Sequence, residues 1–399
     1  MPVSRAAPGN AAAAFAWFDG RWATDLVQTV DLRADPDVLD DGGWWAVVGE
    51  FEGPLWGHRF ATVRRGPRPR SIGPWTGPAA DAWRSSLNGP AYRAGVRAIR
   101  ESIAAGDVYQ VNLCRLLSAP LPPGADPLAL AEVLAAGNPA PYEGVLRLPD
   151  RWLVTASPEL FLERDGDQVT SSPIKGTAGP GQPFAAKDGP ENVMITDLMR
   201  NDLGRVARPG SVRVTALLHR EEHPGLAHLV STVTATLRPG VGWGQLLRAT
   251  FPPGSVSGAP KSSALRVIDR LEPVARGPYC GTIGYVDADR GRARLAVGIR
   301  GFFTTGDLAG ADPRDPARLH FGTGAGITWG SDEDDEWAET ELKAARLVAL
   351  ASGTSGQPGA VRDGPGAVRG RVQHDGADDG DVRAERPVAL DGQRVGRDQ

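Results

Sequence analysis

Residues 141–175 constrain the fold of this chain more strongly than any other stretch. They form consecutive strand-like runs separated by tight turns, and Asp165-Gly166 is a dipeptide typical of two-residue β-hairpin loops. A second strand-like region covers residues 11 to about 65, and seven of the eleven tryptophans precede Ser85. Because large aromatic side chains favour packed layers, residues 1–85 are expected to form a β-rich N-terminal part of the fold.

Helices and further strands are expected over residues 86–351. Tyr92, Val96, Ile99 and Ile103 recur at helical spacing and make one apolar face, and Gly106 ends this helix. Other helices are predicted at 194–203, 260–271 and about 335–351, strands at 108–113, 212–214, 281–286 and 294–303, loops at 65–77 and 120–124, and a strand or helix at 230–237.

Length and charge exclude some classes of protein. The 399 residues suggest two domains or one large one. The formal net charge of −4 argues against a nucleic-acid-binding protein, which needs a basic excess, although an anionic substrate requires only local positive charge. After Ser352 the chain has no aromatic residue, so residues 352–399 are expected to be a disordered tail rich in Gly, Asp and Arg.

The cysteines and the N-terminus indicate a cytoplasmic protein. Cys114 and Cys280 lie in no disulfide framework and no metal-ligand spacing, which favours two buried free thiols in a reducing compartment. Residues 1–10 carry no signal-peptide pattern, and no apolar run approaches the length of a membrane span. No membrane association is therefore expected.

Lys175 is a candidate nucleophile in the segment Pro-Ile-Lys-Gly-Thr (173–177). It follows a predicted strand, and the next residue, Gly176, lets the backbone approach a ligand closely. A lysine shielded from water can lose its proton and attack an electrophile. Most lysines are instead solvated surface charges, so the segment alone leaves both interpretations open.

Acidic residues on two predicted helices are candidate metal ligands. Glu191 lies on one helix, and Glu336, Glu339 and Lys343 share one face of another. Carboxylates from separate helices can jointly hold Mg²⁺, which prefers oxygen ligands. An acidic helix start that only favours the helix dipole is the alternative.

Glycine-rich and helix-opening segments supply candidate anion sites. Gly324 and Gly326 belong to a Gly-Thr-Gly-Ala-Gly run that can present backbone N–H groups to a carboxylate, although a plain turn is an alternative. Its spacing fits neither a dinucleotide-binding loop nor a Walker loop. Residues 255–261 open a helix, whose N-terminus favours anions. The chain has no GxSxG or HExxH motif, so the usual hydrolase and zinc-protease readings lack support.

These segments together resemble the chorismate-utilising enzymes, a family that includes anthranilate synthase component I, aminodeoxychorismate synthase component I, isochorismate synthase and salicylate synthase. The matching segments occur in order over about residues 90–350: 109–113, 157–159, 173–177, 191–202, 228–231, 257–261, 281–285, 299–300, 324–326 and 336–343. The resemblance implies an anthranilate synthase component I-like α/β (α+β) fold. Two antiparallel β-sheets pack at a steep angle in such a fold, with helices around them and the site between them.

The resemblance also implies chorismate as substrate and Mg²⁺ as cofactor. Glu191 and Glu339 match the positions that hold the metal in the family, and Glu336 is a nearby helper. Bound metal neutralises the ring carboxylate of the substrate and makes it an electron sink. Asp188 stands where many relatives have a glutamate.

Further family positions imply roles in substrate binding and proton transfer. Glu159 matches the general acid that helps the ring hydroxyl leave, and His228 matches a histidine beside the ring. The positions that match substrate-binding residues are Gly176, Thr177, Ser255, Tyr285, Arg300, and the backbone at Gly324 and Gly326.

Two positions separate the reactions of the family. Gln110 stands where the water-adding isochorismate and salicylate synthases carry a lysine. Lys175 stands where anthranilate synthases have alanine, and it is the mark of aminodeoxychorismate synthases. The resemblance therefore implies that Lys175 attacks C2 of chorismate and that ammonia then adds at C4, which gives 4-amino-4-deoxychorismate for para-aminobenzoate and folate biosynthesis.

Ammonia is expected from a separate glutamine amidotransferase subunit, because neither cysteine lies in the motif of a glutaminase nucleophile. No tryptophan-site motif is recognisable in the N-terminal region, so no feedback inhibition by tryptophan is expected. Two alternatives remain at this point: anthranilate synthase component I, and a non-catalytic scaffold protein of the same family.

Overall fold

The computed structural model describes residues 14–179, 181–223, 226–310, 312, 314–353 and 362–363. These residues belong to one compact unit that spans residues 1–367. Most of the predicted tail, residues 352–399, lies outside the described residues, as do residues 1–13.

The first β-sheet is antiparallel along its length and supplies one wall of the fold. Its order is β1, β7, β8, β17, β18, β6 and β5, and β14 pairs with the start of β6. The bounds are β1 (Phe15–Phe18), β5 (Arg84–Ser85), β6 (Gln110–Pro120), β7 (Tyr142–Arg147), β8 (Trp152–Ser157), β14 (Gly258–Ala259), β17 (Gly301–Thr305) and β18 (Arg318–Ile327). Beyond β5 lies the short parallel strand β19 (Arg362–Asp363).

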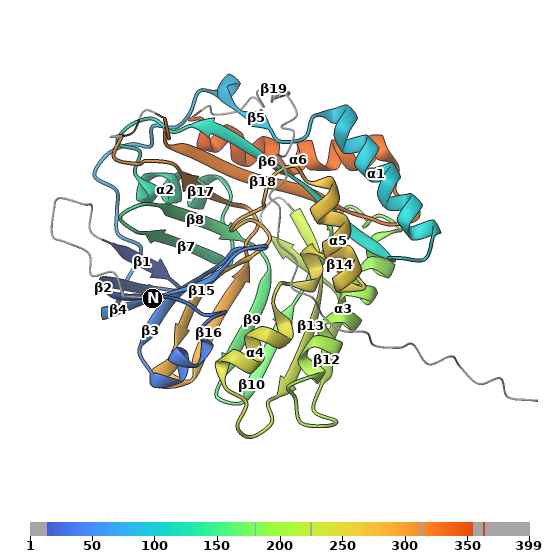
Figure 1. Cartoon of the computed structure of the whole chain (residues 1–399), viewed down its shortest axis with the longest axis horizontal. Helices are drawn as coiled ribbons and strands as arrows, with labels where there is room; N and C mark the ends of the chain where they lie inside the picture. Colours follow the sequence, from blue (N-terminus) through green and yellow to red (C-terminus); the bar gives the residue numbers. More distant parts are fainter. Residues whose placement is uncertain are drawn as a thin grey trace, which may run out of the picture. The chain divides into compact units, whose positions relative to one another are not determined.

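The second β-sheet is antiparallel and faces the first. It runs β4, β3, β15, β16, β9, β10 and β13, and β13 also pairs with β11 and β12. The bounds are β3 (Trp44–Gly49), β4 (Leu55–Arg65), β9 (Leu160–Asp165), β10 (Gln168–Ser172), β11 (Ile174–Ala178), β12 (Arg213–His223), β13 (Leu226–Thr236), β15 (Thr282–Asp287) and β16 (Arg292–Val297). Strands of the first sheet cross those of the second in Figure 1.

The long strand β2 (Arg21–Asp31) joins the two sheets. It pairs with β1 of the first sheet and with β4 of the second, and its register shifts between Leu26 and Gln28. A bulge of this kind bends a strand and increases its twist. The expected two antiparallel sheets are confirmed, with hydrogen bonding that is continuous between them through β2.

Helices cover the outer faces and the ends of the sheets (Figure 1). Their bounds are α1 (Gly89–Ala104), α2 (Pro127–Gly137), α3 (Asp188–Gly204), α4 (Trp243–Thr250), α5 (Lys261–Leu271) and α6 (Glu333–Ala351), with short 3-10 helices η1 (Pro36–Asp41), η2 (Ala80–Ala82), η3 (Gly254–Val256) and η4 (Ala288–Arg290). Helices α2 and α6 pack on the first sheet, and α3 packs on β11, β12 and β13. None of the helices in the described residues is long and apolar enough to cross a membrane.

Two apolar clusters stabilise this arrangement. One fills the space between the sheets and includes Val47, Val111 and Phe161. The other lies between the first sheet and helices α2 and α6, where Leu134 and Leu347 are buried. Each fully buried side chain of this size contributes about 1.5–3 kcal/mol relative to an exposed one.

A buried ion pair fixes the end of α5 against the middle of β6. Arg276 Nη2 donates to Glu272 Oε1 over 2.6 Å and to the carbonyl of Asn112 over 2.6 Å. Glu272 in turn accepts the backbone N–H of Cys114 at 2.8 Å. Breaking such a pair leaves an uncompensated buried charge, so it holds the local register firmly.

Most sequence-predicted elements are confirmed, with bounds that differ from the predicted ones. Helices α1, α3, α5 and α6 cover the predicted helical segments, and residues 230–237 are largely strand. The predicted strand at 294–303 is wrong as one element, because the chain leaves β16 at Val297 and enters β17 at Gly301. Helix α2 was not predicted; its run of alanines and leucines has little amphipathic contrast because much of its surface is buried. The predicted free thiols Cys114 and Cys280 are confirmed as buried.

Candidate active site

Lys175 lies where strands of both sheets converge. It belongs to β11, whose register against β13 shifts between Ile174 and Thr177. Gly176 sits in this irregular stretch with φ of +89°, a conformation that favours glycine. A Cβ atom built on Gly326 of β18 would lie 3.3 Å from Lys175 Nζ and would collide with Gln110 Nε2 of β6. Glycine at 326 therefore leaves room for both side chains.

Glu159 is a buried carboxyl group beside Lys175. It follows β8, is 3% exposed, and interacts with Lys175, with the hydroxyl of Ser255 and with the backbone of Ile174. Burial raises the pKa of Glu159 to about 7, although Ser255, Lys175 and Ile174 each oppose this shift. A carboxyl group with a pKa near neutrality can hold a proton and release it to a leaving group.

His228 lies on β13, the strand that pairs with the Lys175 strand β11. Its Nδ1 lies 3.2 Å from Thr177 Oγ1, and β13 carries it directly across from Thr177 in the register. His228 is 5% exposed, whereas Thr177 is exposed. This contact holds the imidazole two residues along the strand pair from Lys175.

Gln110 and Glu191 connect Lys175 with the acidic residues. Gln110 Nε2 donates to Glu191 Oε2 over 3.3 Å. Both Lys175 and Lys187 lower the pKa of Glu191, but burial outweighs them and raises it. Gln110 Oε1 and Glu191 Oε1 are buried and accept no hydrogen bond from the described part of the chain. Gln110 Oε1 and Glu191 Oε1 are therefore two buried acceptors that could bind a ligand or a metal ion.

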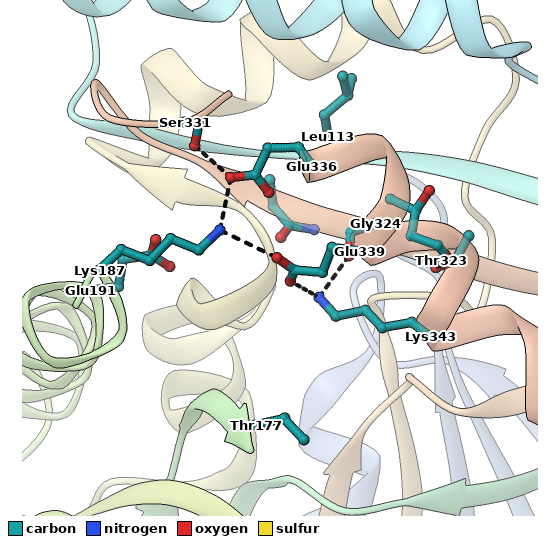
Figure 2. Close-up of polar contacts among 12 residues, drawn as sticks. Leu113, Thr177, Lys187, Glu191, Thr323, Gly324, Ser331, Glu336, Glu339 and Lys343 are labelled. Atoms are coloured by element: carbon teal, nitrogen blue, oxygen red, sulfur yellow. Dashed lines mark hydrogen bonds and ion pairs between the residues drawn. The ribbon is translucent and has the colours of Figure 1, made fainter. Parts of the chain in front are cut away.

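Helix α6 contributes the remaining carboxylates, as Figure 2 shows. Glu336 is 1% exposed and accepts hydrogen bonds at Oε1 from Ser331 Oγ (2.7 Å) and Lys187 Nζ (2.8 Å). Glu339 accepts Lys187 Nζ at Oε2 over 3.2 Å and Lys343 Nζ at Oε1 over 2.6 Å. Lys187, the residue directly before α3, thus bridges both carboxylates of α6.

The charges in this cluster lower the pKa of Glu339 and raise the pKa of Lys187. Burial raises the pKa of Glu339, but Lys343 and Lys187 outweigh burial and lower it to about 2. Burial lowers the pKa of Lys187, yet its hydrogen bond to Glu336 and the charge of Glu339 raise it above its ordinary value. Glu339 and Lys187 are therefore charged at neutral pH.

The donor set fits a hard divalent cation. Glu191, Glu336 and Glu339 present carboxylate oxygens, and two buried oxygens, Glu191 Oε1 and Glu336 Oε2, lack partners among the described residues. No group of three acidic, histidine or cysteine side chains in the described ranges is already gathered around one metal position. The bridging ammonium of Lys187 lies between two of the three carboxylates.

Arg300 and Gly324 meet at Lys343. Arg300 Nη1 donates to the Lys343 carbonyl over 2.9 Å, and Lys343 Nζ donates to the Gly324 carbonyl over 3.0 Å. Arg300 has φ of +56°, and burial lowers its pKa. Arg300 and Gly324 thus contact the two ends of the same residue, Lys343, and the prediction that they bind a substrate carboxylate stays a prediction.

The structure does not bring Tyr285 to this group, which corrects that prediction. Its hydroxyl donates to Asp19 over 2.9 Å, its ring stacks on Trp44 at 5.8 Å, and the guanidinium of Arg21 lies 4.7 Å from the ring centroid. Tyr279, and not Tyr285, lies near Arg300: it is buried, it interacts electrostatically with Arg300, and a Cβ on Gly322 would collide with its ring.

Two cavities lie away from the predicted residues. One, of about 640 Å³, is lined by Trp56, His58, Trp152, Phe303 and other residues of both sheets. The second, of about 730 Å³, is lined by several arginines around Trp44. Neither contains any of the predicted catalytic, substrate-binding or metal-binding residues.

A comparison with known protein families identifies the family of this chain. Residues 63–349 match the family model described as chorismate binding enzyme. The chain belongs to the chorismate-binding enzyme family. Because this match covers more than half of the chain, the predicted family is confirmed.

Curated relatives carry two different names. The chain is 38% identical over 279 residues to aminodeoxychorismate synthase component 1 of Salmonella typhimurium, which covers 67% of this chain and 59% of that protein. It is also 38% identical over 336 residues to anthranilate synthase component 1 of Thermus thermophilus, which covers 81% of this chain and 67% of that protein. The chain thus spans less than two thirds of the Salmonella protein.

Solved structures confirm the predicted fold. Anthranilate synthase component I from Streptococcus pneumoniae superposes with a TM-score of 0.66 at 22% identity, over 87% of this chain and 94% of that one. The menaquinone-specific isochorismate synthase of Escherichia coli gives a TM-score of 0.70 at 17% identity, over 86% and 89% of the two chains.

Sequence reasoning missed three participants in the site. Lys187 precedes the predicted acidic helix, and its basic charge next to Asp188 was a usable signal. Ser331 lies just before α6 at a position typical of a helix start. Tyr279 carried no pattern that distinguishes it from Tyr285, which lies six residues later.

Proposed function

We propose that this chain aminates chorismate at C4 to give 4-amino-4-deoxychorismate. The observation that carries this proposal is the pairing of Lys175 with Glu159, whose pKa is raised to about 7. One group can attack as an amine while the other, which interacts with it, donates a proton. An anthranilate synthase needs no lysine at this position.

The reaction proceeds in two displacements that leave the enolpyruvyl group in place. The amine of Lys175 forms a bond to C2 of the ring, the double bonds shift, and the C4 hydroxyl leaves as water with the proton of Glu159. Ammonia then bonds to C4, the electron pairs return, and the C2–N bond to Lys175 breaks. Proton transfer from the new ammonium group restores the acid form of Glu159. The sum is chorismate plus ammonia to aminodeoxychorismate plus water.

Gln110 disfavours the competing addition of water. Its amide donates to Glu191 and cannot remove a proton from water, unlike an amine at the same place. The residue therefore supports amination over hydration at C2. It also orders Glu191 next to Lys175.

The substrate carboxylates have two binding regions. Arg300 and the backbone at Gly324 and Gly326 would take one, because a guanidinium and backbone N–H groups both favour carboxylates. Glu191, Glu336 and Glu339 would hold Mg²⁺ next to the ring carboxylate of the substrate. The bound metal would neutralise the charge of this carboxylate and help it draw electrons from the ring. Ser255, Thr177 and His228 complete the wall around the ring.

We expect Glu191→Gln to lose most of its dependence on Mg²⁺ together with its activity. The substitution removes one anionic ligand and keeps the hydrogen bond with Gln110, so the fold around β6 should persist. A loss of about a hundredfold or more in kcat/KM is expected, as for removal of a metal ligand or its support. Activity against Mg²⁺ concentration, with and without a chelator, measures this.

Glu341 offers a matched control for the metal-site variant. It is an acidic residue of α6 that pairs with Arg115, away from Lys187 and Glu339. Glu341→Gln is expected to keep the Mg²⁺ dependence of the wild type. If both variants lose activity equally, general loss of negative charge explains the result and the assigned ligand set is wrong.

Ammonia is proposed to come from a separate glutamine amidotransferase subunit. Burial raises the pKa of Cys114 well above its usual range, which is the opposite of what a glutaminase nucleophile needs. Cys280 is fully buried. The chain alone should therefore use ammonium salts and not glutamine.

The product decides between the two candidate reactions. Purified chain, chorismate, Mg²⁺ and ammonium at mildly alkaline pH should give aminodeoxychorismate without pyruvate, identified by mass spectrometry. Anthranilate with an equal amount of pyruvate would instead establish anthranilate synthesis, the reaction that the name of the Thermus relative indicates. Glutamine in place of ammonium is expected to give no product.

A further inference from the structure

Lys187 occupies an unusual place among the residues of the acidic cluster. Its ammonium group donates to carboxylates on two successive turns of α6, at 2.8 Å to Glu336 Oε1 and 3.2 Å to Glu339 Oε2. It comes from the start of α3, on the same helix as Glu191 (Figure 2). A single positive charge thus lies between carboxylates contributed by different helices.

The surrounding atoms are not saturated by Lys187. Glu191 Oε1 and Glu336 Oε2 are buried and have no hydrogen-bond partner among the residues that the structure describes. Buried carboxylate oxygens without partners are costly. The Lys187 ammonium contacts Glu336 Oε1 and Glu339 Oε2 but neither of these two oxygens, whereas a divalent cation can bind several carboxylate oxygens at once.

Lys187 and its neighbour Lys343 have similar exposed fractions, 37% and 32%, but different groups hold their ammonium ends. The Lys187 side chain is 37% exposed, so its long stem can carry the ammonium into water. Lys343 is bound on its other side to the Gly324 carbonyl over 3.0 Å, and it contacts Glu339 through Oε1 only. The Lys187 ammonium therefore contacts both Glu336 and Glu339, whereas the Lys343 ammonium contacts Glu339 and the Gly324 carbonyl.

We propose that Lys187 is a built-in counter-cation, which neutralises the carboxylate cluster in the metal-free chain and must swing out before a divalent cation can bind. This inference rests on the metal site of the proposed function and adds a determinant of its affinity. Displacement of the ammonium breaks two charged hydrogen bonds, so the cation binds more weakly than the three carboxylates alone would allow. The lysine keeps the cluster folded without metal and lowers its affinity for stray cations.

Direct measurement of cation binding tests the proposal without chorismate or ammonia. Mn²⁺ binding to the full chain, followed by electron paramagnetic resonance of free Mn²⁺, should tighten by about tenfold or more in Lys187→Met. Lys187→Arg retains the charge and should bind no more tightly than the wild type. The metal-free Lys187→Met variant should also melt at a lower temperature, and Mn²⁺ should raise its melting temperature more than that of the wild type.

Lys343→Met separates local displacement from a general change of charge. It removes one positive charge from the same carboxylate but frees no space between Glu336 and Glu339, so it should tighten Mn²⁺ binding less than Lys187→Met. Equal or weaker binding in Lys187→Met than in the wild type overturns the proposal. If no variant and not even the wild type binds Mn²⁺, the metal site itself is wrong, and the proposal fails with it.

Discussion

Lys175→Ala is expected to lower the rate of aminodeoxychorismate formation at least about a thousandfold, because the first bond to C2 can no longer form. The side chain of Lys175 lies next to Gly326, and it interacts with the carboxyl groups of Glu159 and Glu191. Removal of its charge should not unfold the chain, since the residue is only half-buried on a strand. Product formation from chorismate and ammonium, followed by mass spectrometry, measures the loss.

A covalent adduct would show that Lys175 is a nucleophile and not only a positive charge. With ammonium omitted, the wild-type chain incubated with chorismate should gain the mass of chorismate minus water, and digestion should place it on the peptide with Lys175. Lys175→Arg keeps the charge without an attacking amine and should show neither adduct nor turnover. Anthranilate and pyruvate from wild type and Lys175→Ala alike would remove the lysine from the mechanism.

Glu159→Gln is expected to lower kcat about a hundredfold to ten-thousandfold, the usual contribution of a general acid. Glutamine preserves the shape of the side chain but carries no proton for the departing hydroxyl. Chorismate binding should be less affected, because Arg300 and the glycine run are untouched by the change. Steady-state kinetics with ammonium at saturation separates the effects on kcat and on KM.

The pH profile gives a separate test of the same residue. Because burial raises the pKa of Glu159 to about 7, the proton-donating form is lost as pH rises through that value. The wild-type kcat/KM for chorismate should therefore fall above about pH 7 when free ammonia is held constant. In Glu159→Gln this falling limb should be absent; its persistence would assign the limb to another group.

Stability against pH provides the folding control for Glu159→Gln. The folded-state pKa of Glu159 is raised from 4.5 to about 7, so the folded chain holds a proton that the unfolded chain releases. Its contribution to stability is present below about pH 4.5 and is lost as pH rises towards and through 7. At pH 8 the melting temperature of Glu159→Gln should therefore equal or exceed that of the wild type.

Much of the fold follows from local patterns in the sequence. The apolar spacing of Tyr92, Val96 and Ile99 predicts α1 because every third or fourth residue must face the core. The Asp165-Gly166 turn predicts the hairpin of β9 and β10, since two-residue loops need left-handed backbone. Local patterns failed for α2, whose buried surface removes the contrast between its faces.

Site residues were predictable from the sequence where a reactive residue type stands at a position that matches a family segment. Lys175, Glu159 and Glu191 were predicted from the order of family segments, and in the structure Lys175 interacts with both carboxyl groups. Tyr285 was misassigned because Tyr279 and Tyr285 flank the same short segment. The pairing of β15 with β3 and β16 carries Tyr285 to Trp44 and Asp19 instead.

Residue type and spacing within short segments predicted most of the helices and strands, although not α2, and indicated the kinds of reactive group. Only the tertiary structure decided which groups act together. Gln110, Lys175 and Gly326 are far apart in the chain and meet because β6, β11 and β18 converge. The raised pKa of Glu159 and the bridge of Lys187 to α6 likewise arise from burial and from contacts between distant segments, which no local pattern records.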